Sequence, residues 1–122
     1  MNNNRVVITG MGIISPIGTG IESFYNALKE GKCGIDMVTK FDTEGYDTKI
    51  AAEVKDFDPS TYIDRKEAKR MDRYAQFAVA AAKMAIEMSK LDVENIDNGR
   101  FGVCIGSGIG GMETLENQHK IL

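Results

Sequence analysis

The residues of this sequence that could take part in chemistry begin with a glycine-rich loop. Residues Gly106 to Gly111 are Gly-Ser-Gly-Ile-Gly-Gly, which satisfies the pattern G-x-G-x-x-G. Between a strand and a helix, this pattern is typical of a dinucleotide-binding turn, because glycines let the backbone approach a pyrophosphate. The complete pattern also has an acidic residue about 20 positions further on, and the sequence ends before that position. One hypothesis is therefore an oxidoreductase domain that binds NAD or NADP with this loop.

Two cysteines and one histidine are the other candidate reactive groups, and their spacing gives no complete catalytic set. Cys33 and Cys104 would need a neighbouring base or a positive environment to form a nucleophilic thiolate. Cys104 lies in an apolar run, where a small buried residue is the more common role, and Cys33 lies in a predicted loop. His119 is the only histidine, on a polar helix face where we expect it to be solvated. We predict no catalytic residue and no metal site in this chain.

A basic cluster lies in the first turns of the longest predicted helix. Between positions 64 and 73 there are five basic and three acidic residues, a local charge of 5 − 3 = +2; the basic residues are Arg65, Lys66, Lys69, Arg70 and Arg73. Composition alone favours an ordinary solvated helix end. The other interpretation is a surface for an acidic partner, because opposite charge steers association.

Local patterns predict the elements that hold these residues, and together they indicate an α/β domain. The β-branched segments 5–9 and 101–105 each precede a glycine turn and are typical of buried parallel strands. A helix is predicted over 22–30, with Thr19 and Glu22 forming a capping box and Gly31 ending the helix. The last residues, 112–122, have the composition of a helix start that the chain end interrupts.

The middle of the chain is less regular until a long helix begins. Residues 33–62 are predicted to contain one strand or hairpin arm near 50–54, and a turn or helix start at 58–60. From Asp64, which can cap the first turn, to about Lys90 we predict a single helix. Its apolar residues form two faces, one of large side chains and one of alanines, so we expect its distal half to be buried on both sides.

Composition excludes several classes of protein. The chain has 122 residues, enough for one domain, and its 43% hydrophobic and 27% charged residues indicate a folded globular protein. A net charge of −3 argues against nucleic-acid binding, which depends on many basic residues. Two cysteines without a C-x-x-C spacing imply no disulfide framework. The polar first five residues and the lack of a run of about 20 apolar residues argue against a signal peptide and a membrane span, so we expect a cytoplasmic protein.

Several further motifs follow one another along the chain. Arg-Val-Val-Ile-Thr-Gly-Met-Gly at 5–12 is followed by Ser-Pro-Ile-Gly at 15–18, Phe-Asp-Thr at 41–43 and Val-Lys-Asp-Phe at 54–57. Arg-Lys-Glu at 65–67, Met-Asp at 71–72 and the run 105–111 complete the series. In order and spacing, this series resembles that of the β-ketoacyl-acyl-carrier-protein synthases, the condensing enzymes of type II fatty-acid synthesis. The resemblance covers nearly the whole chain, and several ordered motifs are more specific than the glycine loop alone.

The resemblance implies both a fold and a reaction. Members of this family have a thiolase-like layered α/β/α/β/α fold and act as homodimers, and residues 1–122 are similar to most of the N-terminal half of their synthase domain. They join an acyl thioester to malonyl-acyl carrier protein by decarboxylative Claisen condensation, without a cofactor. The family's nucleophilic cysteine and two histidines lie in segments that would follow Leu122, so we expect the chain as it stands to be inactive.

The resemblance also assigns roles to four residues of this chain. Lys66, Lys69 and Arg70 match basic residues that bind the acidic acyl carrier protein. Ile109 matches a residue that lines the acyl-chain pocket. The oxidoreductase domain using Gly106 to Gly111 remains the alternative.

Overall fold

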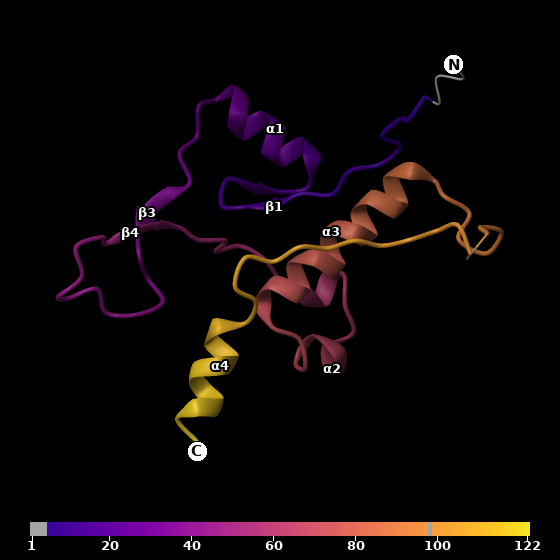
Figure 1. The fold of residues 1–122 in the computed structure, drawn as a ribbon. Coiled ribbons are helices and arrows are strands. Elements are labelled where there is room, and N and C mark those ends of the chain that lie inside the picture. Colours follow the sequence, from indigo (N-terminus) through magenta and orange to yellow (C-terminus); the bar gives the residue numbers. More distant parts are fainter. Residues whose placement is uncertain (1–4, 98) are drawn as a thin grey trace. The chain divides into compact units, whose positions relative to one another are not determined.

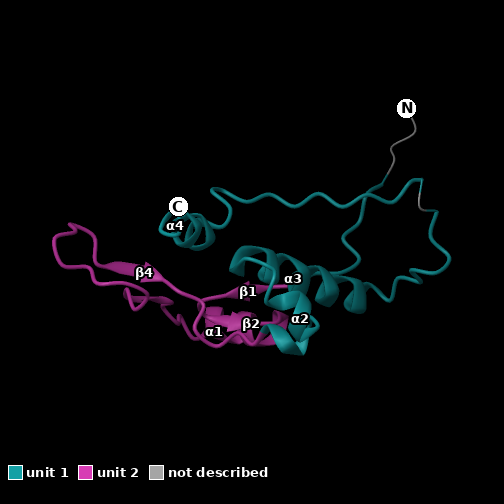
Figure 2. Ribbon diagram, turned by 90° about the horizontal axis from the view of Figure 1, so that it is seen from below, with its two compact units in different colours: residues 1–11, 59–122 teal, residues 12–58 magenta. Residues whose placement is uncertain are grey.

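The computed structural model describes residues 5–97 and 99–122, which belong to two compact units (Figure 2). Unit 1 contains the residues up to Met11 together with Pro59 to Leu122, and unit 2 contains Gly12 to Asp58. Residues 1–4, part of the polar N-terminus that argued against a signal peptide, and residue 98 lie outside the described residues. Figure 1 shows the helices and strands of both units.

Unit 2 begins with a short antiparallel hairpin that leads directly into a helix. β1 (Ile14–Ser15) pairs with β2 (Gly18–Thr19), and α1 (Ile21–Lys29) follows. The predicted capping box is wrong, because Gly20 is the N-cap of α1 and no side chain caps it. Thr19 is paired across the hairpin instead, one residue before the cap position.

The predicted end of α1 is confirmed. Gly31 has a φ of +67°, in the left-handed region that glycine adopts without strain. Its N–H donates to the carbonyl of Leu28 at 3.1 Å, and the N–H of Lys32 donates to the carbonyl of Ala27 at 2.9 Å. These bonds satisfy two of the last carbonyls of the helix, so the helix stops here.

A second hairpin follows in unit 2 and confirms the strand predicted near residues 50–54. β3 (Ile35–Met37) pairs antiparallel with β4 (Ile50–Ala52), and the register places Met37 opposite Ile50. Both of these side chains are exposed. The hairpin therefore holds its shape through backbone bonds and polar contacts, with little apolar burial of its own.

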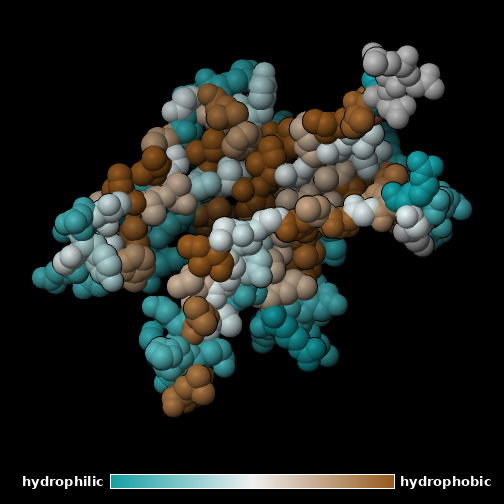
Figure 3. All heavy atoms as spheres, in the orientation of Figure 1, coloured by the Kyte–Doolittle hydropathy of each residue, from teal (hydrophilic) through white to brown (hydrophobic). Residues whose placement is uncertain are grey.

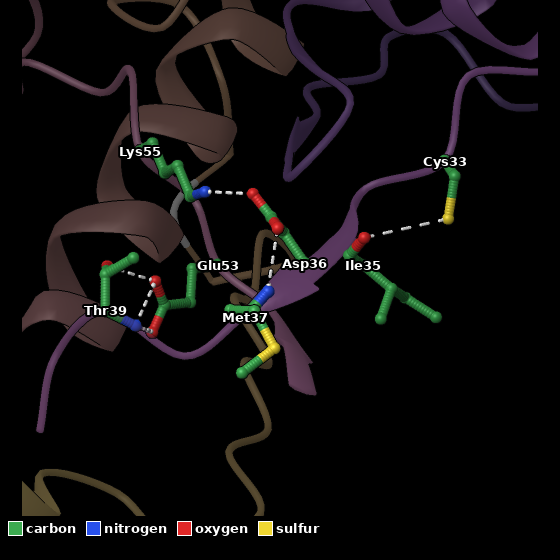
Figure 4. Close-up of polar contacts among 7 residues, drawn as sticks. All are labelled: Cys33, Ile35, Asp36, Met37, Thr39, Glu53 and Lys55. Carbon is green, nitrogen blue, oxygen red and sulfur yellow. Dashed lines mark hydrogen bonds and ion pairs between the residues drawn. The ribbon is translucent and has the colours of Figure 1, made fainter. Parts of the chain in front are cut away.

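Two charge-assisted contacts hold the strands and the loop of this hairpin (Figure 4). Nζ of Lys55 donates to Oδ2 of Asp36 at 2.8 Å. The carboxylate of Glu53 accepts from the N–H of Thr39 at 3.1 Å and from its hydroxyl at 2.6 Å. The bond from Lys55 lowers the pKa of Asp36 and raises the pKa of Lys55, and the bonds from Thr39 lower the pKa of Glu53. Asp36, Thr39 and Lys55 are exposed and Glu53 is partly exposed, so solvent screens these contacts strongly.

Unit 1 is mainly helical, and its long helix is broken. A short 3-10 helix, η1 (Pro59–Thr61), confirms the turn or helix start predicted at 58–60. The helices α2 (Arg65–Ala68), α3 (Arg73–Ser89) and α4 (Met112–His119) follow. The single helix predicted from 64 to 90 is therefore wrong. Asp72 has an extended conformation (φ −61°, ψ 157°) and acts as the N-cap residue of α3, which separates α3 from α2.

The segments 5–9 and 101–105 do not form the predicted strands. Neither belongs to a β-ladder, and Val6, Ile8 and Val103 are 92%, 83% and 75% exposed. A buried parallel strand needs hydrogen-bonded neighbours and cover on both faces. Within the described residues these segments have neither, so they remain extended and unpaired.

The apolar core is small in both units. Five apolar residues are buried among those described: Ala27, Phe57, Ile63, Ala68 and Ala80. Many hydrophobic side chains lie open to solvent on the face shown in Figure 3. The expectation that the distal half of α3 is buried on both sides is wrong for this chain, because Ile86 and Met88 are exposed. None of the helices in the described part is long and apolar enough to cross a membrane.

Candidate functional site

Three exposed basic residues, Lys66, Lys69 and Arg70, lie within α2 and in the break that follows it, and we call them the basic turn. Lys66 lies within α2, and its N–H donates to the side chain of Asp64 at 2.8 Å, which caps this four-residue helix as predicted. Lys69 is the C-cap residue, and Arg70 follows it. Within the described residues, none of the three side chains has an ion-pair partner. Their charges are therefore available to another molecule.

Arg73 belongs to the same basic run but is held within the fold. It is only partly exposed, and its Nη1 donates to Oε1 of Gln76 at 3.3 Å. Its guanidinium also lies 5.0 Å from the ring centroid of Phe77, within the range of a cation–π interaction. The structure thus separates one structural arginine from the three residues of the basic turn.

Gln76 is a residue that the sequence did not single out. Its Nε2 donates to the carbonyl of Ala68 at 2.8 Å and to the carbonyl of Met71 at 3.2 Å. These carbonyls belong to the end of α2 and to the segment that joins it to α3. An uncharged amide on a helix carries no sequence signal for such a contact, because the contact exists only once the helix is broken.

The glycine loop leads into α4 without the strand that a dinucleotide site requires. The N–H of Gly110 donates to Oγ of Ser107 at 3.1 Å, and Gly110 has a φ of +79°. The hydroxyl of Thr114, in α4, donates to the carboxylate of Asp72, which connects α4 to the start of α3. Ile109 is 81% exposed in this loop. The strand–turn–helix context of the fingerprint is therefore incomplete among the described residues.

An apolar groove of about 510 Å³ lies between α3 and residues 101–105. Its α3 wall is made of small residues and one isoleucine: Ala78, Ala81, Ala82, Ala85 and Ile86. Cys104 lines the other wall and is exposed, so the expectation of a buried Cys104 is wrong. The segment that carries it has no strand neighbour among the described residues. Ile109 is not among the residues that line this groove.

The described residues contain no assembled catalytic set. Cys33 is exposed, and its Sγ lies 3.9 Å from the carbonyl of Ile35, with no base beside it (Figure 4). His119 is exposed on α4, as predicted. Residues 5–97 and 99–122 contain no group of three or more potential metal ligands. The features of this chain that can act on another molecule are thus the basic turn and the apolar surfaces.

Comparison with known proteins identifies the family. Residues 3–121 match the family described as "Beta-ketoacyl synthase, N-terminal domain". The 3-oxoacyl-[acyl-carrier-protein] synthase 2 of Staphylococcus aureus (strain N315) is 49% identical over 120 residues, 98% of this chain and 29% of that protein. A protein of the same name from Synechocystis sp. is 45% identical over 122 residues, 100% of this chain and 29% of that protein. The chain therefore belongs to the β-ketoacyl synthase family, and it spans about 29% of the length of these curated relatives.

Solved structures agree with this assignment. The ishigamide ketosynthase/chain length factor has a TM-score of 0.66 and 42% identity, over 74% of this chain and 22% of that one. A type II PKS ketosynthase in complex with its acyl-carrier protein has a TM-score of 0.73 at 24% identity, over 93% of this chain and 29% of that one, which shows the fold alone. The chain thus has the predicted thiolase-like fold, and these comparisons give no support to the alternative NAD- or NADP-binding domain.

Proposed function

We propose that this chain is part of an enzyme that elongates fatty acids by decarboxylative Claisen condensation. The enzyme would join an acyl thioester to malonyl-acyl carrier protein and release 3-oxoacyl-acyl carrier protein and CO2. The observation that carries this proposal is the family match over residues 3–121, together with relatives named 3-oxoacyl-[acyl-carrier-protein] synthase 2. Residues 1–122 would form the N-terminal part of one synthase domain, and the full-length protein would be a cytoplasmic homodimer.

The catalytic groups of this reaction are proposed to lie outside the described residues. A condensing enzyme needs a cysteine thiolate to accept the acyl group, and a thiolate needs a base or positive environment to form. Cys33 and Cys104 are exposed, neither is hydrogen-bonded to a basic side chain among the described residues, and His119 is the single histidine of the sequence. This part would contribute to substrate and partner binding rather than to bond making.

The basic turn is proposed to bind the acyl carrier protein. Lys66, Lys69 and Arg70 are exposed, adjacent and without an internal ion-pair partner among the described residues, in a chain whose net charge is −3. Local positive charge on an otherwise acidic chain orients an acidic partner more than it adds affinity. A related solved ketosynthase is itself in complex with its acyl-carrier protein.

Ile109 is proposed to line the acyl-chain pocket of the full-length enzyme. Its side chain is 81% exposed between glycines, so it is free to contact an apolar ligand. An apolar side chain beside residues without side chains can set the length of chain that fits.

Charge reversal at the basic turn tests the docking proposal in the full-length enzyme. We expect the triple variant Lys66→Glu, Lys69→Glu and Arg70→Glu to raise the KM for acyl-acyl carrier protein. Three exposed pairs contribute about 0.6 to 3 kcal/mol in total, which corresponds to about 3- to 150-fold. Turnover of a pantetheine or coenzyme A thioester should stay nearly unchanged, and the salt dependence of the carrier reaction should flatten.

The matched control reverses three exposed lysines of unit 2: Lys32, Lys40 and Lys49. Both triple variants change the net charge equally, so a difference between them reports position rather than total charge. Equal losses on carrier-bound and small thioesters would show that the basic turn supports the fold, and the docking proposal would then be dropped.

A further inference from the structure

We propose that Gln76 is a positioning residue for the acyl carrier protein, because its side-chain amide fixes the turn that presents Lys69 and Arg70. This inference rests on the proposed docking function. The basic turn lies where one helix ends and the next begins, so its side chains point in directions that the backbone between Ala68 and Arg73 determines. The contacts of Gln76 fall on this backbone.

The turn has few other bonds that fix it. The N–H of Arg70 donates to the carbonyl of Glu67 at 2.9 Å, and the N–H of Met71 donates to the carbonyl of Ala68 at 3.2 Å. No side chain caps the start of α3, although Asp72 occupies the N-cap position. A helix of four residues is marginal by itself, since helix formation has a costly nucleus. The two bonds from Gln76 therefore connect the end of α2 and residue 71 to the first turn of the 17-residue helix α3.

Arg73 fixes the orientation of the Gln76 amide. Nη1 of Arg73 donates to Oε1 of Gln76 at 3.3 Å, so the oxygen faces the guanidinium and the NH2 group faces the carbonyls. The guanidinium is in turn placed over the ring of Phe77. Phe77, Arg73 and Gln76 thus form a connected set of side chains on the first turns of α3, of which Gln76 contacts the backbone of the turn, and none of the three needs to contact the partner.

Two substitutions in the full-length enzyme separate the donor function of Gln76 from its shape. Gln76→Glu keeps the acceptor for Arg73 and removes both donors, and Gln76→Met removes the polar group while keeping the length. We expect both to raise the KM for acyl-acyl carrier protein by about three- to tenfold, comparable with losing part of the contacts of the basic turn. The kcat and KM for a coenzyme A thioester should stay within about twofold, a change too small to indicate a lost interaction. Gln118→Met makes the same chemical change on an exposed part of α4 and should match the unmodified enzyme.

A double-mutant cycle distinguishes positioning from a purely structural role, because it compares the loss of carrier binding caused by the Gln76 substitutions with and without the side chains of Lys69 and Arg70. In a Lys69→Ala, Arg70→Ala background the Gln76 substitutions should add no further loss, because the side chains that Gln76 positions are already absent. Additive losses, or equal losses on both substrates, would overturn the inference. If the triple reversal weakens carrier binding selectively but the Gln76 variants behave as the unmodified enzyme, docking stands and the positioning role is rejected. If the triple reversal has no selective effect, the docking function fails and this inference fails with it.

Discussion

Gly10 is the position at which a single added methyl group should most clearly disturb the fold of unit 1. A Cβ built on Gly10 would lie 2.0 Å from the carbonyl oxygen of Ala85 in α3 and 3.0 Å from Cβ of Ser89. Ordinary van der Waals contact for such an atom begins at 3.4 Å. Either the segment that carries Gly10 or the helix α3 would therefore have to move by 3.4 − 2.0 = 1.4 Å. The obstructing atom belongs to the helix backbone, which cannot turn aside as a flexible side chain can. We therefore expect Gly10→Ala to lower the free energy of unfolding by about 1 to 3 kcal/mol, the usual cost of overpacking.

Urea denaturation of the full-length protein measures this effect, with Gly102→Ala as the matched control. A Cβ on Gly102 would meet no atom within 4 Å, and Gly102 does not have a positive φ, so the same chemical change should be tolerated. Alanine restricts the unfolded chain equally in both variants, and their difference isolates the close approach to α3. If the two free energies of unfolding agree within about 0.5 kcal/mol, the contact between Gly10 and α3 does not exist in the folded protein.

The remaining predictions concern a cap, a pH dependence and the chain in isolation. Asp64→Ala should lower the free energy of unfolding by about 1 kcal/mol, because the bond from the backbone N–H of Lys66 to the Asp64 side chain is lost. Asp64→Asn should lower it less, and urea denaturation measures both effects. The pKa of Glu53 in the folded protein is lowered from its ordinary value of 4.5 by the bonds from Thr39. These bonds therefore stabilise the hairpin above pH 4.5, and this stabilisation is lost as the pH falls through the lowered pKa of the folded protein. An NMR titration of the Thr39 amide should follow this loss, and Glu53→Gln should remove the transition. The purified 122-residue chain should bind a hydrophobic dye, melt without cooperativity and form no β-ketoacyl product, in fluorescence, calorimetry and product assays.

The parts of the fold that the sequence predicted correctly are those that local residues determine. The helix predicted over 22–30 is α1 at Ile21–Lys29, because its apolar spacing and the terminal Gly31 act within one or two turns. The strand near 50–54 pairs with a neighbour only a loop away, and the start at Pro59 follows from a turn residue. Asp64 caps its helix as predicted because a cap needs only the two following residues.

The predictions that were wrong concern elements that depend on contacts with residues distant in the sequence. Whether residues 5–9 and 101–105 become strands depends on neighbouring strands, and β-branched composition cannot supply them. The break at Asp72 was hidden because the apolar periodicity continues through it. The amide of Gln76 donates to two carbonyls across this break, and a run of helix-forming residues does not predict such bonds.

The candidate site shows the same limit at the level of single charges. A count of five basic residues between 64 and 73 cannot distinguish a solvated helix end from a docking surface, because both have the same composition. The contacts that each cation makes within the chain can distinguish the two cases, because a cation that stabilises the fold has such contacts. Arg73 is engaged, through Gln76 and the ring of Phe77, whereas Lys66, Lys69 and Arg70 have no ion-pair partner among the described residues. Arg65 is exposed as well and has no ion-pair partner among the described residues, so of the five cations only Arg73 is held within the fold. A charge reversal at Arg73 should therefore damage the fold, whereas reversals at the basic turn should damage only binding.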